Sequence, residues 1–88
     1  MPRLHLLNKS PDHPRFVRCL ACVGADDTLV LMENAVLAMA GDQVPKAIRT
    51  LALAEDLGAR GLASGAVASI SMAQLVALTE THETVISW

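Results

Sequence analysis

Short apolar runs alternate along the chain with segments rich in polar residues, glycine or proline. The clearest run is TLVLM at Thr28–Met32, which is apolar at almost every position. A run without polar alternation is typical of a strand covered on both faces, as in a parallel sheet. The same reasoning predicts four further strands, over Leu4–Lys9, Thr50–Asp56, Ala66–Ser71 and Thr84–Trp88. The Ala and Leu content of the second of these leaves helix open there as an alternative.

Helical spacing and helix-capping residues fill the intervals between these strands. A helix is predicted over Pro14–Val23, with Asp12 as its N-cap. Pro14 suits the first turn, because its missing N–H would have no partner there. Further helical segments are predicted over residues 34–39, 55–61 and 72–82.

Strands that alternate with helices indicate an α/β fold. We predict a single three-layer α/β/α domain over residues 1–88, with a mostly parallel sheet of about five short strands. In such sheets, binding and catalytic groups gather where strands end and helices begin. Those places here are Lys9-Ser10, Glu33-Asn34 and Glu55-Asp56. For the last pair, the preference of helix starts for acidic side chains is the simpler interpretation.

The composition favours association with another subunit. The chain has 88 residues, of which 52% are hydrophobic, and Phe16 and Trp88 are its only aromatic residues. A domain of this size buries only somewhat more than ~60% of the surface that its unfolded chain exposes. Part of this aliphatic surface is therefore expected to face another subunit.

Charge and hydropathy argue against two classes of partner. The formal net charge is −2, and no block of Lys or Arg is present, so no direct nucleic-acid surface is expected. Gly61–Thr79 carries no charge, but its glycine, serine and glutamine residues do not suit a membrane-spanning helix. Two cysteines make no disulfide framework and the amino terminus lacks a signal-peptide pattern, which predicts a cytoplasmic protein.

The two cysteines, Cys19 and Cys22, lie in the segment VRCLACV. Their C-x-x-C spacing suggests a redox dithiol, but that chemistry uses a cysteine at a helix N-terminus, and Cys19 lies well inside the predicted helix. At ~100° per residue, Cys19 falls on the edge of an apolar stripe and Cys22 between two arginines. Cys19 is then half-buried and Cys22 the more exposed thiol. That both are inert core residues stays open, since free cysteine is often buried.

Other familiar sites are missing from the sequence. No glycine-rich phosphate loop follows a strand. His5, His13 and His82 are scattered, which does not provide the matched ligand pairs of a zinc site. We therefore expect neither a cofactor nor a metal.

Five segments, in their order and spacing, resemble one family. They are LHLLNKSP, the helix with its cysteine, LVLMEN, LAEDLGARGL, and the ending LT-x-x-H-x-x-V-x-S-W. Together they resemble the DsrH/TusB family of sulfur-relay subunits, in the DsrE/DsrF/DsrH-like superfamily. The resemblance runs over nearly the whole chain.

The resemblance implies a component of a sulfurtransferase complex rather than a stand-alone enzyme. It implies a heterohexamer with homologous DsrE/TusD-like and DsrF/TusC-like subunits, which receives persulfide sulfur from a donor protein and passes it to an acceptor. The complex would serve 2-thiolation of the tRNA wobble uridine or, alternatively, cytoplasmic sulfur oxidation. Self-association of the chain expressed alone stays open. A different class of function is a non-catalytic homo-oligomeric α/β binding module with inert cysteines.

The resemblance also assigns a role to one thiol. Cys19 matches the family's cysteine in the first helix and is the candidate persulfide carrier, although many TusB-type members lack this cysteine. Its thiolate would attack the terminal sulfur of a donor persulfide. Cys22 has no counterpart and is a secondary candidate. The sequence departs from the family pattern at Ala35, where a glycine is usual, and at Met72, where an aromatic residue is common.

Overall fold

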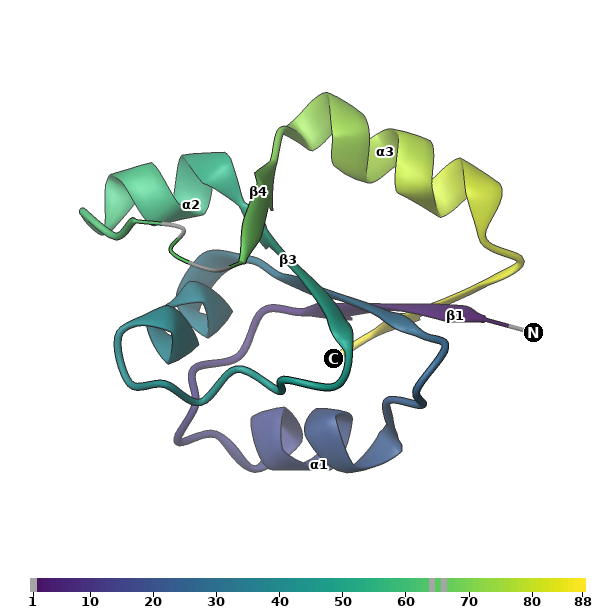
Figure 1. Cartoon of the computed structure of the whole chain (residues 1–88), viewed down its shortest axis with the longest axis horizontal. Coiled ribbons are helices and arrows are strands. Elements are labelled where there is room, and N and C mark those ends of the chain that lie inside the picture. Colours follow the sequence, from purple (N-terminus) through teal and green to yellow (C-terminus); the bar gives the residue numbers. More distant parts are fainter. Residues whose placement is uncertain (1, 64, 66) are drawn as a thin grey trace.

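Strands and helices alternate along the whole chain in the computed structural model, which describes residues 2–63, 65 and 67–88 (Figure 1). The strands are β1 (Arg3–Leu7), β2 (Thr28–Leu31), β3 (Arg49–Leu53), β4 (Ala68–Ile70) and β5 (Thr84–Ser87). The α-helices are α1 (Pro14–Cys22), α2 (Ala54–Ala59) and α3 (Met72–Thr81), and η1 (Glu33–Met39) is a 3-10 helix. The predicted α/β fold is confirmed.

The five strands form one sheet in the order β4-β3-β2-β1-β5. Every neighbouring pair in it is parallel. β2 lies at the centre, and all four of its residues are buried, as its continuous apolar run predicted.

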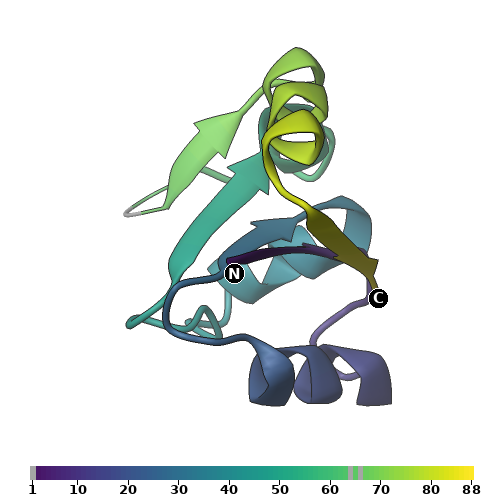
Figure 2. The same ribbon diagram turned by 90° about the vertical axis from the view of Figure 1, so that its right-hand side faces the viewer.

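The strand order explains why α3 lies apart from the other helices. From β1 to β4, each strand is added on the same side of the previous one, whereas β5 returns to the far side of β1. Crossovers between parallel strands are right-handed, so a return in the opposite direction places its helix on the opposite face. Figures 1 and 2 show α1 and α3 on opposite sides of the sheet.

The core is accordingly divided into two layers. The larger cluster joins Phe16 and Cys19 of α1, Val36 of η1 and Leu57 of α2 to one face of the sheet. The smaller cluster lies on the other face, where Leu75 of α3 packs with side chains of the four strands β1 to β4. Among the helices of the described ranges, α3 therefore covers its face alone.

Two predicted strands differ most from the observed ones. The apolar run predicted as a strand over Thr50–Asp56 is β3 only as far as Leu53, and α2 begins at Ala54 with its acidic residues in the first turn. The strand prediction therefore holds up to Leu53, and the helix alternative holds from Ala54 onwards. The strand predicted over Ala66–Ser71 is β4, Ala68–Ile70; residue 66 lies outside the described residues. The helix predicted over residues 34–39 is the 3-10 helix η1.

No helix within the described ranges combines the length and the apolarity that crossing a membrane requires.

Candidate functional site

The helix α1 carries both cysteines, and its start differs from the prediction. The N-cap is His13, whose Nδ1 accepts a hydrogen bond from the backbone N–H of Arg15 at 3.0 Å. The prediction of Asp12 as the cap is wrong, because its carboxylate instead accepts a hydrogen bond from the Ser10 hydroxyl. Pro14 occupies the first turn as expected.

Cys19 is enclosed by the core. Its side chain packs with the apolar cluster between α1 and the sheet, and the residue is 0% exposed. Burial raises the pKa of the Cys19 thiol to about 12, and the neighbouring Cys22 acts in the same direction. A thiol in this environment reacts poorly, because the thiolate is the nucleophile. The structure therefore buries Cys19 more deeply than its place on the edge of the apolar stripe suggested.

Cys22 is the exposed thiol of the pair. It ends α1, and its backbone carbonyl accepts a hydrogen bond from Nη2 of Arg3 at 3.0 Å. This contact holds one guanidinium beside the end of the helix. As the helical phase predicted, Cys22 rather than Cys19 is the sulfur that meets solvent.

The loop after α1 is fixed to β1 by the buried carboxylate of Asp27. Its Oδ1 accepts a hydrogen bond from the backbone N–H of Arg3 at 2.9 Å. Its Oδ2 accepts hydrogen bonds from the backbone N–H of Gly24 and from Nε2 of His5, each at 2.9 Å. The Gly24 and Arg3 backbone donors hold the pKa of Asp27 well below its usual range, with smaller contributions from His5 and the Arg3 guanidinium.

His5 links Asp27 to Trp88. The indole Nε1–H of Trp88 donates to Nδ1 of His5 at 3.1 Å, and the two rings stack with centroids 6.2 Å apart. Indole can only donate, so Nδ1 of His5 accepts and carries no proton. His5 is therefore the Nε2–H tautomer and donates to Asp27.

Little in the order of residues pointed to this Asp27–His5–Trp88 chain. A histidine within an apolar strand was visible, but its partners lie 22 and 83 positions away along the sequence. A histidine at an inward position of a buried strand implies hydrogen-bonding partners. Only the strand order, with β5 beside β1, identifies the second partner.

At the carboxyl ends of the strands, the structure brings together two of the three predicted pairs, Glu33-Asn34 and Glu55-Asp56. The backbone N–H of Glu33 donates to Oδ2 of Asp56 at 2.7 Å, and Nη2 of Arg60 donates to Oδ1 of Asn34 at 2.9 Å. Nη1 of Arg60 also lies 3.7 Å from Oδ1 of Asp56. The acidic residues open α2, as the simpler interpretation predicted, and Asp56 also ties α2 to η1.

The third predicted pair lies elsewhere on the same edge. Nζ of Lys9 donates to the backbone carbonyl of Trp88 at 2.9 Å and to Oδ1 of Asn8 at 2.6 Å. Lys9 thus fixes the end of β5 beside the end of β1. Its role here is structural.

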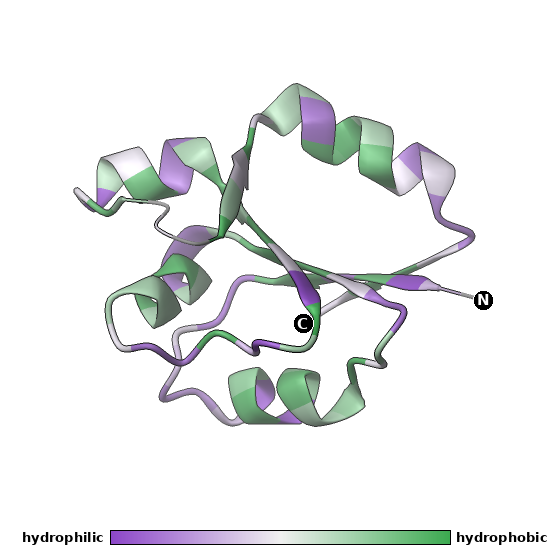
Figure 3. Cartoon of the chain, in the orientation of Figure 1, coloured by the Kyte–Doolittle hydropathy of each residue, from purple (hydrophilic) through white to green (hydrophobic). Residues whose placement is uncertain are grey.

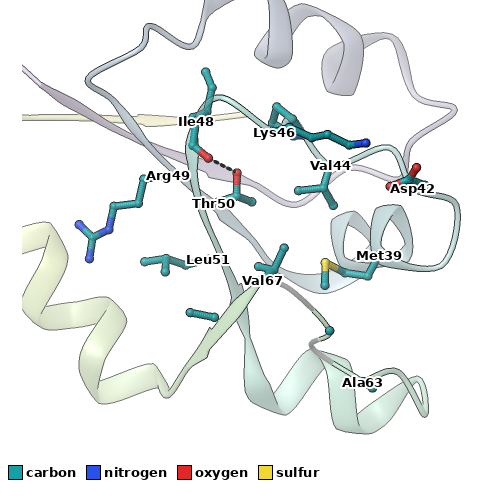
Figure 4. Close-up of a pocket in the computed structure, with 13 residues that line it drawn as sticks. Met39, Asp42, Val44, Lys46, Ile48, Arg49, Thr50, Leu51, Ala63 and Val67 are labelled. Atoms are coloured by element: carbon teal, nitrogen blue, oxygen red, sulfur yellow. Dashed lines mark hydrogen bonds between the residues drawn. The ribbon is translucent and has the colours of Figure 1, made fainter.

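A groove lies at the opposite edge, beside the amino-terminal ends of β3 and β4 (Figure 4). Its cavity volume is about 650 Å³. Met39, Val44 and Val67 give it apolar walls. Its charged lining residues are Lys46, Arg49 and Asp42, which are of both signs. Neither cysteine lines it. The groove offers binding space, but none of the thiol chemistry.

No group of three or more metal-binding side chains occurs in the described part of the chain. The thiol that the structure leaves exposed is that of Cys22, at the end of α1.

Two comparisons identify relatives of the chain. A model of the family described as DsrH like protein matches residues 9–85. The solution NMR structure of protein Tm0979 from Thermotoga maritima has the same fold, with a TM-score of 0.69 and 25% sequence identity, and the match covers 89% of this chain and 91% of that chain. No curated protein sequence matches significantly. The family match spans most of the sequence and confirms the resemblance seen in its five segments: the chain belongs to the DsrH-like family.

Proposed function

We propose that this chain is a docking subunit of a cytoplasmic sulfur-relay complex that serves 2-thiolation of the tRNA wobble uridine. The observation that carries the proposal is the DsrH-like family match over residues 9–85, which indicates a sulfur-relay subunit. Its partners in the complex would be homologous DsrE/TusD-like and DsrF/TusC-like subunits. The relay needs neither metal nor cofactor, because a persulfide is passed by exchange between thiols.

The environment of Cys19 supports a docking role over that of principal sulfur carrier. At pH 7 a thiol with a pKa of about 12 is ionised in roughly one molecule in 100,000. The thiol is also enclosed between α1 and the sheet. Transfer to Cys19 would therefore require α1 to move away from the sheet. A partner subunit that binds α1 is the agent that could move it.

Cys22 offers the direct route on the resting domain, because its thiol is exposed. Its thiolate would attack the terminal sulfur of a donor persulfide, forming a persulfide on Cys22 and releasing the donor as a thiolate. One S–S bond breaks and another forms, so no oxidant or reductant is consumed. Sulfur exchange on this chain, in our proposal, begins at Cys22 and reaches Cys19 only when α1 is displaced.

The exchange is tested by loading the protein with a cysteine desulfurase and cysteine, followed by intact-mass spectrometry. We expect an adduct of about 32 Da, one sulfur atom, on the wild type and on Cys19→Ser, and none on Cys22→Ser. Repeating the reaction with DsrE-like and DsrF-like partners tests the buried thiol. An adduct on Cys22→Ser under those conditions would place Cys19 in the relay.

Absence of any adduct, with and without partners, would contradict the carrier role for both thiols. A non-catalytic binding module with inert cysteines would then explain the chain better. The tRNA branch has its own test, in which the gene is deleted and 2-thiouridine is measured in total tRNA. We expect its loss; unchanged 2-thiouridine together with impaired sulfur oxidation would assign the subunit to that pathway instead.

A further inference from the structure

The last turn of α1 holds both thiols of the chain, three residues apart. Only Leu20 and Ala21 stand between Cys19 and Cys22, and Figure 3 shows hydrophobic colouring at this end of the helix. In an α-helix, residues at this spacing are neighbours on the surface, and their Cα atoms lie about 5 Å apart. That separation falls within the range of about 4.4–6.8 Å found in disulfides. The helix therefore places the two cysteines within bonding range of each other.

Burial protects Cys19 from reagents in solution but not from the neighbouring cysteine. The residue is 0% exposed, so a persulfide on another protein cannot reach it while α1 is packed on the sheet. Burial raises the pKa of the Cys19 thiol, and Cys22 adds to this effect, so the two thiols are close enough to interact. A sulfur atom on Cys22 needs no path through the core. It is therefore the sulfur that the resting fold can present to Cys19.

We propose that Cys19 resolves a persulfide on Cys22, so that sulfur which no acceptor has taken is discharged as sulfide. This inference rests on the proposed sulfur exchange at Cys22 and adds a second outcome to it. The sulfur of Cys19 attacks Sγ of Cys22, which is the inner sulfur of the persulfide. The outer sulfur leaves, and a disulfide between Cys19 and Cys22 remains.

The step balances without an external oxidant. The S–S bond between Sγ of Cys22 and the outer sulfur breaks, and one S–S bond between the two cysteines forms. The outer sulfur keeps the electron pair of the broken bond, takes the proton of the Cys19 thiol and leaves the deprotonated persulfide as HS⁻. It is thereby reduced, and the cysteine pair is oxidised. Because the proton leaves with the sulfur, no free Cys19 thiolate has to accumulate.

The end of α1 controls how fast the two sulfurs meet. The Cβ atoms of residues at this spacing lie about 5–6 Å apart in a regular helix, whereas a disulfide needs about 3.5–4.5 Å. The backbone N–H of Val23 donates to the carbonyl of Cys19 at 3.1 Å and closes this turn. Opening the turn lets the side chains approach while the rest of α1 stays on the sheet. The persulfide on Cys22 therefore lasts long enough to be passed on when an acceptor is present.

The discharge is tested by loading the protein with sulfur, removing the donor, and following intact mass and released sulfide over time. One arm loads with a cysteine desulfurase and cysteine, and the other with inorganic polysulfide. The wild type should pass from the adduct of about 32 Da to a species about 2 Da lighter than the reduced chain, releasing one sulfide per chain. Cys19→Ser keeps Cys22 and should hold the adduct at least ~10-fold longer. Cys19→Ala repeats the test, and circular dichroism establishes which variant folds.

A variant at the end of α1 tests the control by the last turn. Val23→Pro removes the N–H that bonds to Cys19, and the observed φ of −71° at this position suits proline. It also disfavours the helical conformation of Cys22, which precedes it. Discharge should be roughly 3- to 10-fold faster than in the wild type, as loss of one backbone hydrogen bond implies. The matched control is Val17→Ala, at an exposed position earlier in α1, which should leave the rate unchanged.

Several results would overturn the proposal. They are a wild-type adduct that lasts as long as that of the Cys19 variants, sulfide release without the lighter species, and a disulfide between two chains, seen as a doubled mass. An unchanged rate in Val23→Pro would overturn control by the last turn. Failure of the desulfurase arm alone, with discharge after polysulfide loading, would instead contradict the proposed sulfur exchange and support the resolving role of Cys19.

Discussion

Asp27 joins three parts of the molecule that are distant in sequence. Its carboxylate binds Arg3 and His5 of β1 and the backbone of Gly24 after α1, while His5 in turn binds Trp88. Only 5% of Asp27 is exposed. A buried carboxylate is tolerated when its oxygens have donors and a cation nearby, and Asp27 has both.

Replacing Asp27 by asparagine should strongly destabilise the domain. In either orientation, the amide NH₂ would face a backbone N–H that now donates to the carboxylate, that of Arg3 at Oδ1 or that of Gly24 at Oδ2. We expect a loss of about 2–4 kcal/mol in the free energy of unfolding at pH 7, measured by urea denaturation. Asp26→Asn is the matched control, because Asp26 is exposed beside it and should change stability by less than about 0.5 kcal/mol.

The wild type and Asp27→Asn, compared at several pH values, test the pH dependence of this contribution. The pKa of Asp27 is lowered in the folded state, so its contribution to stability is fully present above the unfolded value of about 3.9 and falls as the pH drops below it. The difference in stability between wild type and Asp27→Asn should therefore shrink between pH 5 and pH 3. An equal difference at both pH values would show that the charge of Asp27 contributes nothing.

The tautomer of His5 can be tested separately. Nitrogen-15 NMR of the imidazole should show a protonated Nε2 and an unprotonated Nδ1. Trp88→Phe should lower the free energy of unfolding by about 1–3 kcal/mol, because it leaves Nδ1 of a buried histidine without its donor. A protonated Nδ1 in the wild type would contradict the hydrogen-bond chain.

The helical phase of the cysteines was predicted from the sequence, whereas their burial was not. The phase correctly separated an inner Cys19 from an outer Cys22, because helical geometry is local. The full enclosure of Cys19 depends on β1, β2 and η1, which pack with it in one cluster. Such long-range packing leaves no local pattern.

At the scale of elements, the turn after β2 contains a strained residue. Glu33 adopts φ +50°, a left-handed conformation that is costly for residues with a Cβ. Its backbone N–H is held there by Asp56. The sequence pointed instead to Ala35, where a glycine is usual in the family. Ala35, however, is a buried residue of η1 outside the positive-φ region.

Glu33→Gly should therefore stabilise the protein. Glycine adopts this conformation without strain, and the backbone hydrogen bond to Asp56 is kept. We expect a gain of about 0.5–1 kcal/mol in the free energy of unfolding, measured by urea denaturation. Ala35→Gly is the control and should destabilise the protein by about 1 kcal/mol or more. If Ala35→Gly were the more stable variant and Glu33→Gly the less stable one, the glycine would be required at residue 35 instead.

Element types were largely predictable, whereas their ends depended on competing local interactions. The boundary between β3 and α2 falls within a continuous run of Ala and Leu, and only the acidic residues that follow mark the new helix. The start of α3 is fixed by a capping box between Ser71 and Gln74, which was not predicted. The N-cap of α1 is His13, one residue after the predicted Asp12, since both side chains can accept hydrogen bonds.

At the scale of the whole molecule, the alternation of strands and helices predicted the class of fold correctly. It did not predict the strand order, because each apolar run suits several positions in a parallel sheet. The position of β5 beside β1 determines which face α3 covers and brings Trp88 to His5. The Asp27–His5–Trp88 hydrogen-bond chain could therefore not be predicted from the sequence, because it depends on the strand order.

The pairing of β1 with β5 also affects how the chain folds. β1 can pair with β2 early, but its other edge stays open until the last-made strand arrives. Closing so long a loop is slow. Until then, β1 presents unpaired backbone groups beside Leu4 and Leu6, which is the kind of edge that recruits strands from other chains. We therefore expect β1 to be the last of the three inner strands to be paired on both sides, when β5 and Trp88 cover its open edge.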